Sequence, residues 1–277
     1  MNYRHAFHAG NHADVFKHAA LVAVLEHLRA KPAPFAVLDT HAGLGVYDLA
    51  SEGALKTREF EVGVARVFGA DLPAARGYLD LLAALNPGGL ATYPGSPEIV
   101  RRLLREHDRL VACELHPAEH AALKARYRAD RRIAVHHRDG YEAVGALLPP
   151  PERRGLVLID PPYEQPDEAQ RLAAALAIGL RRWPTGIFMA WYPIKDNAIG
   201  DVLAGAAVVG GFPKTLRAEL TPFPRDGVGM AGGGLLVVNA PWKLDETLAA
   251  LGAGLAARLG DGCGKWSVAW VTKEPSA

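Results

Sequence analysis

The sequence predicts an α/β protein built on a doubly wound, mostly parallel β-sheet. Short apolar runs typical of buried strands alternate with helical stretches along much of the chain. With 277 residues and 49% hydrophobic content, the chain is long enough to bury one large core. Several expected strands end at a carboxylate, and open sheets of this kind bind ligands beyond the carboxyl ends of their strands. We therefore expect a functional site at that edge of the sheet.

A helix is expected near the start of the chain, from about residue 12 to residue 30. Asn11 precedes it, and an asparagine there can accept a hydrogen bond from the first turn. Asp14 lies in that turn, where a negative charge suits the helix dipole. Apolar residues recur behind it at helical spacing, so one face of the helix is expected to pack.

The first strand is expected at FAVLD (35–39), and it enters the loop THAGLG (40–45). Gly43 and Gly45 allow the backbone of this loop to approach a ligand, although such turns also serve plain packing of a strand against a helix. Further apolar runs typical of strands follow. They are residues 109–115, 132–138, 155–160, 186–192, 215–220, 234–239 and 266–271.

Residues 49–95 separate the first strand from the second by more than one crossover needs. They contain two helical stretches, at about 55–68 and 73–85. We expect them to form a small inserted helical subdomain, with residues 1–48 and 96–277 forming the main domain.

A glycine-rich segment, TPFPRDGVGMAGGG (221–234), lies between two expected strands. Its five glycines and two prolines disfavour regular structure. We expect a loop beside the functional site, with a long hairpin connection as the alternative.

The charge balance gives no overall field that would attract a polyanion. Lysine plus arginine number 31 and aspartate plus glutamate 30, so a nucleic acid would have to be held by local patches. The two cysteines match neither a disulfide framework nor a metal spacing. No signal peptide and no run of about 18 apolar residues occurs. We expect a cytoplasmic protein without a membrane segment, and the balanced charge favours a monomer.

Four expected strands end in, or just before, an acid: Asp39, Glu114, Asp139 and Asp160. Parallel strands bring their carboxyl ends to one edge, so these side chains are expected to converge. A nucleoside ligand would use them in turn. Glu114 can accept hydrogen bonds from both ribose hydroxyls, and Asp139 from an adenine amino group.

The tetrapeptide DPPY places Asp160, Pro161, Pro162 and Tyr163 directly after an apolar run. A specified tetrapeptide arises by chance in such a chain with a probability on the order of one in a thousand. The prolines fix the backbone and donate no hydrogen bond, so the turn offers acceptors beside Asp160.

Such a cluster of acceptors suits an exocyclic amino group, with the ring of Tyr163 stacked on the base that carries it. Accepting both amino hydrogens of adenine localises the N6 lone pair, which can then attack a methyl group on a sulfonium. The alternative is a strand end in which Tyr163 merely packs.

Six of the eleven histidines fall within the first 41 residues. His8 and His12 have the spacing of a helical metal site, but no further ligands complete a set, so no metal is expected. Lys17 and His18 are instead expected to reach the carboxylate tail of a bound cofactor. His41 lies inside the glycine loop itself.

Eight motifs occur in an order that identifies a family. They are YRHAFHAGNHADVFKH (3–18), LDTHAGLGVY (38–47), YPGSP (93–97), ELHP (114–117), DG (139–140), GLVLIDPPYE (155–164), WYP (191–193) and PWKL (241–244). Over nearly its whole length the sequence resembles the bacterial 23S ribosomal RNA adenine-N6 methyltransferases of the RlmJ type. The first two motifs are much more specific than DPPY, which occurs in many amino-methyltransferases.

This resemblance implies a Rossmann-like methyltransferase fold, with a mostly parallel seven-stranded sheet and an inserted helical subdomain, that uses S-adenosylmethionine to methylate 23S ribosomal RNA. Asp160 would be the catalytic proton acceptor and Tyr3 a contact to the RNA. The residues alone would make Ser96 a turn residue or helix cap, and Tyr3 part of a disordered terminus. The implied cofactor contacts are His18, His41, Ser96, Glu114, Asp139, Gly140 and Asp160.

Three other functions remain open from the residues. A DNA adenine-N6 methyltransferase needs the same acceptors, although the neutral charge and the lack of an obvious target-recognition domain count against a duplex reader. A nicotinamide-dependent oxidoreductase would need G-x-G-x-x-G with an acid about 20 residues on, and the chain has neither. A non-catalytic RNA-binding or metal-binding module is the third alternative.

Overall fold

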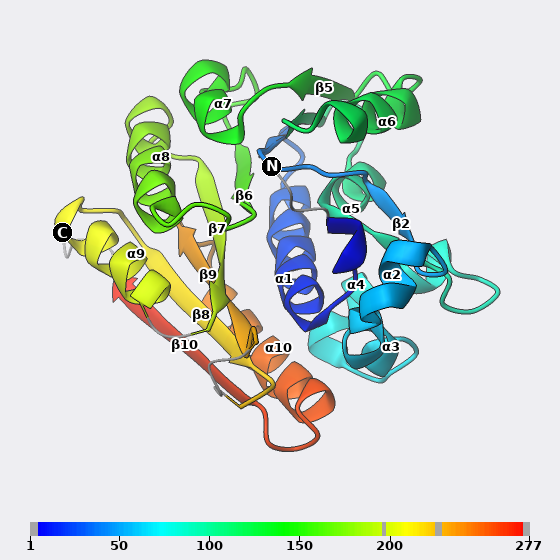
Figure 1. The fold of residues 1–277 in the computed structure, drawn as a ribbon. Coiled ribbons are helices and arrows are strands. Elements are labelled where there is room, and N and C mark those ends of the chain that lie inside the picture. The colour runs from blue at the N-terminus through cyan, green and yellow to red at the C-terminus, as the bar shows by residue number, and fades with distance from the viewer. Residues whose placement is uncertain (1–4, 196–197, 225–228, 274–277) are drawn as a thin grey trace.

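The fold is that of a computed structural model, which describes residues 5–195, 198–224 and 229–273. One large sheet runs through the molecule (Figure 1). Its strand order is β10-β8-β9-β7-β6-β1-β4-β5. The strands are β1 (Ala36–Asp39), β4 (Arg109–Glu114), β5 (Ile133–His137), β6 (Gly155–Ile159), β7 (Ile187–Ile194), β8 (Thr215–Thr221), β9 (Gly232–Val238) and β10 (Lys265–Thr272).

The sheet confirms the doubly wound arrangement but corrects the strand number. β5, β4, β1, β6 and β7 are parallel neighbours, whereas β9, β8 and β10 continue the sheet in antiparallel pairs. Eight strands therefore form it in the described part of the chain, as the apolar runs predicted, whereas the family resemblance implied seven. The edge strand β10 corresponds to the predicted run 266–271 and pairs antiparallel with β8.

Helices cover both faces of the sheet, and each face has its own core. Alternate residues of each strand point to opposite faces, so Leu156 and Leu158 of β6 join one core while Val157 and Ile159 join the other. The first core holds residues of α1 (His12–Arg29), α4 (Arg76–Leu85), α5 (Ser96–Leu103), α6 (Pro117–Tyr127) and α10 (Leu244–Leu259). The second holds residues of α7 (Gly140–Leu147), α8 (Glu168–Arg182) and α9 (Ala198–Val209).

Helix α1 begins as predicted but is buried on more than one face. The Asn11 side chain accepts a hydrogen bond from the Asp14 amide at 2.9 Å, and the helix ends at Arg29. It contacts β9 of the sheet and also α4, α5 and α10, so it lies inside the molecule instead of on its surface (Figure 1). Polar side chains on this helix must therefore find partners within the protein.

The expected insertion is helical, but its helices are shorter than predicted. The first stretch breaks at Arg58, which has a φ of 55°, and the turn at Gly63 keeps the second half separate. A Cβ on Gly63 would lie 2.1 Å from the Gly10 carbonyl oxygen, so this approach requires glycine. The elements are α2 (Glu52–Thr57), η2 (Glu59–Val62), α3 (Val64–Val67), η3 (Pro73–Ala75) and α4.

A small antiparallel sheet, which the sequence analysis missed, encloses the insertion. β2 (Val46–Asp48) pairs with β3 (Thr92–Pro94), and so brings the two ends of the insertion together. Val64 and Tyr78 of the insertion belong to the same hydrophobic core as the large sheet. The division of residues 49–95 from the main domain stays a prediction.

The glycine-rich segment connects β8 to β9 as a long hairpin and begins and ends beside the main cavity, since Phe223, Gly229 and Met230 line it. Its last glycines belong to β9, which starts at Gly232 instead of residue 234. Residues 225–228 lie outside the described ranges. Within those ranges, no helix is both long and apolar enough to cross a bilayer.

Candidate active site

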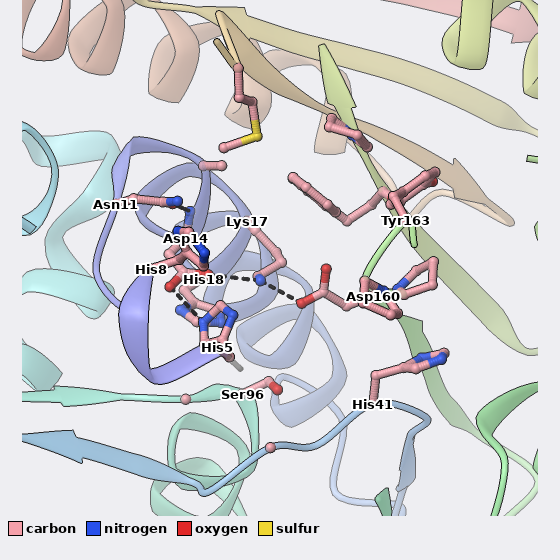
Figure 2. Close-up of a pocket in the computed structure, with 18 of the residues that line it drawn as sticks. His5, His8, Asn11, Asp14, Lys17, His18, His41, Ser96, Asp160 and Tyr163 are labelled. Carbon is pink, nitrogen blue, oxygen red and sulfur yellow. Dashed lines mark hydrogen bonds and ion pairs between the residues drawn. The ribbon is translucent and has the colours of Figure 1, made fainter. Parts of the chain in front are cut away.

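A cavity of about 540 Å³ lies at the carboxyl ends of β1, β4, β6 and β7. Its walls come from segments far apart in the chain: the first turns of α1, the loop after β1, the start of α5, and residues at the ends of β4, β6 and β7. Figure 2 shows how side chains from these segments face one another. The volume is typical of a small-molecule site. A cavity therefore lies at the edge of the sheet where the sequence predicts a site.

Most of the predicted site residues line this cavity. They are Lys17, His18, His41, Gly43, Ser96, Glu114, Asp160, Pro161 and Tyr163. Among the described lining residues are also His5, His8, Asp14, Glu59 and Trp191, which sequence reasoning did not select. Tyr3, the expected RNA contact, lies outside the described residues.

Asp139 and Gly140 are near the cavity but do not line it. The Asp139 carboxylate accepts hydrogen bonds from the amides of Tyr141 and Glu142 at 2.8 and 3.1 Å, so it caps α7. A Cβ on Gly140 would lie 2.4 Å from the Thr40 carbonyl oxygen, which shows how closely α7 approaches the loop after β1. Contact of these two residues with a cofactor stays a prediction.

Asp160 is held by Lys17, which lies 143 residues earlier in the chain. Lys17 Nζ lies 2.5 Å from Asp160 Oδ2 and 2.8 Å from Asp14 Oδ1. Burial lowers the pKa of Lys17, but Asp14 and Asp160 outweigh burial and raise it, so the lysine stays charged. Asp160 Oδ1 has no hydrogen-bond partner among the described residues and is available as an acceptor (Figure 2).

Asp14 connects this ion pair to the amino-terminal segment. Besides Lys17, its carboxylate accepts hydrogen bonds from the Gly10 amide and from His5 Nε2, both at 2.9 Å. Burial raises the pKa of Asp14, but His5 and Lys17 outweigh it and hold the pKa well below its usual range. Asp14 is therefore an ionised group at the centre of a buried network. The sequence showed it only as a helix-dipole residue.

Glu114 and the glycine loop form the opposite wall. Gly43 has a φ of 61°, and its amide donates a hydrogen bond to Glu114 Oε2 at 2.8 Å. Glu114 Oε1 accepts a second hydrogen bond from the His116 amide at 2.7 Å. A carboxylate has about four acceptor positions, so Glu114 can still accept hydrogen bonds from a ligand. Ser96, the first residue of α5, is buried beside this wall.

The two histidines of the predicted site are neutral; His18 is buried and His41 is half-buried. Burial lowers the pKa of His18 to about 3 and that of His41 to about 4. His18 Nδ1 lies 2.8 Å from the Tyr93 hydroxyl, and His41 Nδ1 lies 2.8 Å from the Thr40 hydroxyl. Neither ring carries a charge at neutral pH, so each can offer a cofactor only neutral hydrogen bonds and packing.

Asp39, the first of the four strand-end acids, lies beneath the cavity instead of in its wall. It is the last residue of β1 and fully buried, and neither carboxylate oxygen has a hydrogen-bond partner in the described part of the structure. Burial raises the pKa of Asp39 to about 7; the nearby Ser96 hydroxyl and His41 amide lower it in part, and the Asp160 charge raises it. Of the four acids, only Glu114 and Asp160 therefore converge on the cavity itself.

Tyr163 and Trp191 form an aromatic corner of the cavity. Tyr163 has a φ of 53°, and its hydroxyl donates a hydrogen bond to the Trp191 carbonyl at 2.9 Å. The two rings meet edge to face, with centroids 5.7 Å apart. A Cβ on Gly233 would lie 2.7 Å from Trp191 Nε1, so the glycines of β9 provide the space for this indole. In the sequence these are the WYP motif (191–193) and the glycine run 232–234, which the pairing of β7 with β9 brings side by side.

Comparison with known proteins gives a consistent result. The family described as "Ribosomal RNA large subunit methyltransferase D, RlmJ" matches residues 32–272. The chain is 41% identical to ribosomal RNA large subunit methyltransferase J of Escherichia coli, across 99% of this chain and 100% of that protein. It is 40% identical to the protein of the same name in Haemophilus influenzae, again across 99% and 100%.

A solved structure is also similar over most of its length. Protein LPL1258 of Legionella pneumophila superimposes with a TM-score of 0.89 and is 33% identical, covering 95% of this chain and 98% of that one. Both relatives extend across the large sheet, the insertion and the cavity, and the family match covers the same regions except the amino-terminal segment and α1. The chain belongs to the RlmJ family of ribosomal RNA large subunit methyltransferases.

Proposed function

We propose that this protein transfers a methyl group from S-adenosylmethionine to N6 of an adenine in 23S ribosomal RNA. The observation that carries the proposal is the position of the DPPY turn: Asp160, Pro161 and Tyr163 line the same cavity as Glu114 and Gly43. A group of acceptors suited to an amino group thus faces a wall suited to a nucleoside. The names of the relatives in the family support ribosomal RNA and give the DNA alternative no support.

The target base is proposed to bind on the Asp160 side. Lys17 occupies Oδ2 of Asp160, which leaves Oδ1 to accept a hydrogen bond from the adenine amino group. Pro161 and Pro162 donate no hydrogen bond, so the carbonyl groups of the turn can accept the second amino hydrogen. Tyr163 offers a ring for stacking. A base must leave its stack to reach this corner, which favours an adenine in a loop or in unfolded RNA.

The cofactor is proposed to bind on the Glu114 side. This wall fits the group because Glu114 faces the cavity with acceptor positions left, and Gly43 brings the backbone close. The cofactor supplies an electrophilic methyl group on a sulfonium. Glu114 would hold its ribose, and Lys17 would lie near its carboxylate tail. The other proposed contacts are His18, His41, Ser96, Asp139, Gly140 and Asp160, and no metal takes part in the proposal.

Asp160 is proposed to accept the proton that the methylated nitrogen releases. That nitrogen becomes cationic and strongly acidic on attack, so a weak base suffices. Placement and hydrogen bonding by Asp160 would then provide most of the acceleration. The ion pair with Lys17 supports this role, because it fixes the orientation of the carboxylate before the substrate arrives.

The finer points are also part of the proposal. Tyr3 would contact the RNA, and residues 49–95 would act as an inserted subdomain beside residues 1–48 and 96–277. The protein would work as a monomer in the cytoplasm, where the ribosomal RNA to be modified is made. Light scattering on purified protein tests the monomer, and a mass of twice the chain mass of 29.6 kDa would contradict it.

Isotope-labelled S-adenosylmethionine tests the function directly. The protein is incubated with unmodified 23S ribosomal RNA and, separately, with unmethylated duplex DNA, and the labelled nucleoside is identified by mass spectrometry. Labelled N6-methyladenosine from RNA alone supports the proposal. Label in DNA alone would keep the chemistry of the DPPY turn and overturn the substrate, and label in neither would overturn both.

A further inference from the structure

The described lining of the cavity is richer in acids than in cations. Five carboxylates line it: Asp14, Glu59, Glu114, Glu119 and Asp160. The lining includes two lysines and no arginine among the described residues. Lys17 contacts both Asp14 and Asp160, so its single positive charge is already engaged with two carboxylates. An RNA strand that delivers a base to this cavity brings phosphates towards a lining with more carboxylates than lysines, which opposes binding unless a cation lies at the rim.

The second lysine, Lys195, is such a cation. It directly follows β7, is exposed, and forms no ion pair with any described residue. Nothing in the fold described above uses its charge. A lysine in this state can bind a phosphate as a mobile point charge without first giving up another partner.

Lys195 is also placed in line with the aromatic corner. Trp191, Pro193 and Lys195 all line the cavity, as expected for alternate residues on one face of a strand. Trp191 at the inner end contacts Tyr163, and Lys195 is at the outer end, about 13 Å further along the strand at 3.3 Å per residue. Phe223 and Met230, from the connection between β8 and β9, also line the cavity.

We infer that this outer part of β7 is the path of the substrate strand, and that Lys195 binds the phosphate of the target nucleotide or of its immediate neighbour. The inference rests on the proposed function and deepens it. The base would lie against Tyr163 and Trp191, Pro193 would pack against the sugar, and the backbone would leave the cavity at Lys195. Lys195 is thus a positioning residue for the RNA and does not contact the reacting atoms.

The test uses the full-length protein and unmodified RNA that contains the target adenine. Replacement of Lys195 by alanine (K195A) should lower kcat/KM for RNA about tenfold, as expected for loss of one hydrogen bond to a charged group. The dependence of log K on log salt should become shallower by about 0.7, the value for one phosphate of a single strand. S-adenosylmethionine affinity, measured by calorimetry, should not change. K195R should retain most of the binding.

Lys31 provides the matched control, because it is exposed, follows α1 at the opposite edge of the sheet, and does not line the cavity. K31A should leave both kcat/KM and the salt slope unchanged. RNA with an uncharged methylphosphonate at either phosphate flanking the target adenine gives a thermodynamic cycle. At one of the two positions, the uncharged linkage should lower kcat/KM of the wild type about as much as K195A lowers it on normal RNA. The uncharged linkage at that position should lower kcat/KM of K195A little further.

The outcomes separate this inference from the proposed function. If wild type methylates RNA but K195A keeps the full salt slope, the inference is overturned and the proposed function stands. Additive losses from K195A and the uncharged linkage at both positions would overturn it as well. If wild type transfers no label to RNA, the proposed function fails and the inference fails with it.

Discussion

Two walls of the cavity are built by different kinds of interaction. The glycine-loop wall, made of Gly43, Ser96 and Glu114, is held by backbone amides that donate to the Glu114 carboxylate. The charged wall, made of Asp14, Lys17 and Asp160, is held by charged side chains that contact one another. Both walls lie at the same edge of the sheet, yet they depend on the chain in different ways.

The difference decides how each wall responds to change. Backbone amides are present whatever the side chain, so the glycine-loop wall tolerates substitutions that keep its conformation. In the charged wall, Asp14 and Lys17 are buried, Asp160 is partly buried, and removal of one charge leaves its partner uncompensated. We therefore expect the largest effects of mutation in the charged wall, and effects of backbone strain in the glycine-loop wall.

Asp160→Asn should have the largest effect. The amide cannot accept a proton as the carboxylate does, and it loses the ion pair with Lys17, so turnover should fall on the order of 10²- to 10⁴-fold. S-adenosylmethionine binding should be kept in part, because the glycine-loop wall is untouched. Single-turnover kinetics and calorimetry measure the two effects. Asp167→Asn is the control, since this exposed acid lies outside the cavity. Wild-type turnover in Asp160→Asn would rule out the assigned role.

Lys17→Met should destabilise the fold as well as the site. The side chains of Lys17 and Asp14 are only 4% and 2% exposed, so methionine would leave a buried carboxylate without its cation. The free energy of unfolding should fall by about 3–5 kcal/mol, as for other buried pairs that lose one partner. Urea denaturation measures it, with Lys31→Met as an exposed control. Adding Asp14→Asn to Lys17→Met should recover part of the loss, and purely additive losses would show that the two charges are not coupled.

Gly43→Ala tests the glycine-loop wall. An alanine there would have to adopt a φ of 61°, and its Cβ would lie 2.2 Å from the Tyr47 hydroxyl. The expected loss of stability is about 1–3 kcal/mol, with weaker cofactor binding as the loop shifts. Gly69→Ala is a matched control, because Gly69 has a φ of 73° but no atom within 4 Å of the added Cβ. Equal losses for both variants would show that the contact with Tyr47 is unimportant.

The sequence predicted which residues lie at the cavity better than it predicted the contacts between them, and the reason is physical. Parallel strands bring their carboxyl ends to one edge, so Glu114 and Asp160 could be placed together from their positions after strands alone. The cap at Asn11 depends only on its own helix. Such features depend on local sequence or on the topology of the sheet.

The remaining features depend on contacts that local sequence does not encode. Lys17 contacts Asp160 across 143 residues, and a helical lysine carries no sign of such a partner. Trp191 lines the cavity because Gly233 on the neighbouring strand leaves room for its ring. Asp139 resembled a ligand-binding acid in the sequence, whereas in the structure it caps α7. The family resemblance supplied Ser96, which no pattern of residues distinguishes from an ordinary turn.

The smallest expected effect is the pH dependence of stability that arises from His8 and Glu59, which line the cavity next to the charged wall. His8 Nδ1 lies 2.7 Å from Glu59 Oε1, and both side chains are about one-third exposed. The hydrogen bond that His8 donates to the Glu59 carboxylate raises the pKa of His8 above 6.5. Burial raises the pKa of Glu59, but His8 and Asn11 outweigh it and lower the pKa below 4.5. Because solvent screens the pair, its contribution should stay below about 1 kcal/mol.

The sign of each shift defines the pH window of this contribution. The stability that His8 contributes is fully present below pH 6.5 and is lost as pH rises through its raised pKa. The stability that Glu59 contributes is fully present above pH 4.5 and is lost as pH falls through its lowered pKa. Glu59→Gln should therefore lower the free energy of unfolding most between pH 4.5 and pH 6.5, as measured by urea denaturation at a series of pH values. Glu61→Gln, in an exposed pair with Arg58, is the control. If the loss of stability in Glu59→Gln does not depend on pH, neighbouring groups and not this pair join the insertion to the amino-terminal segment.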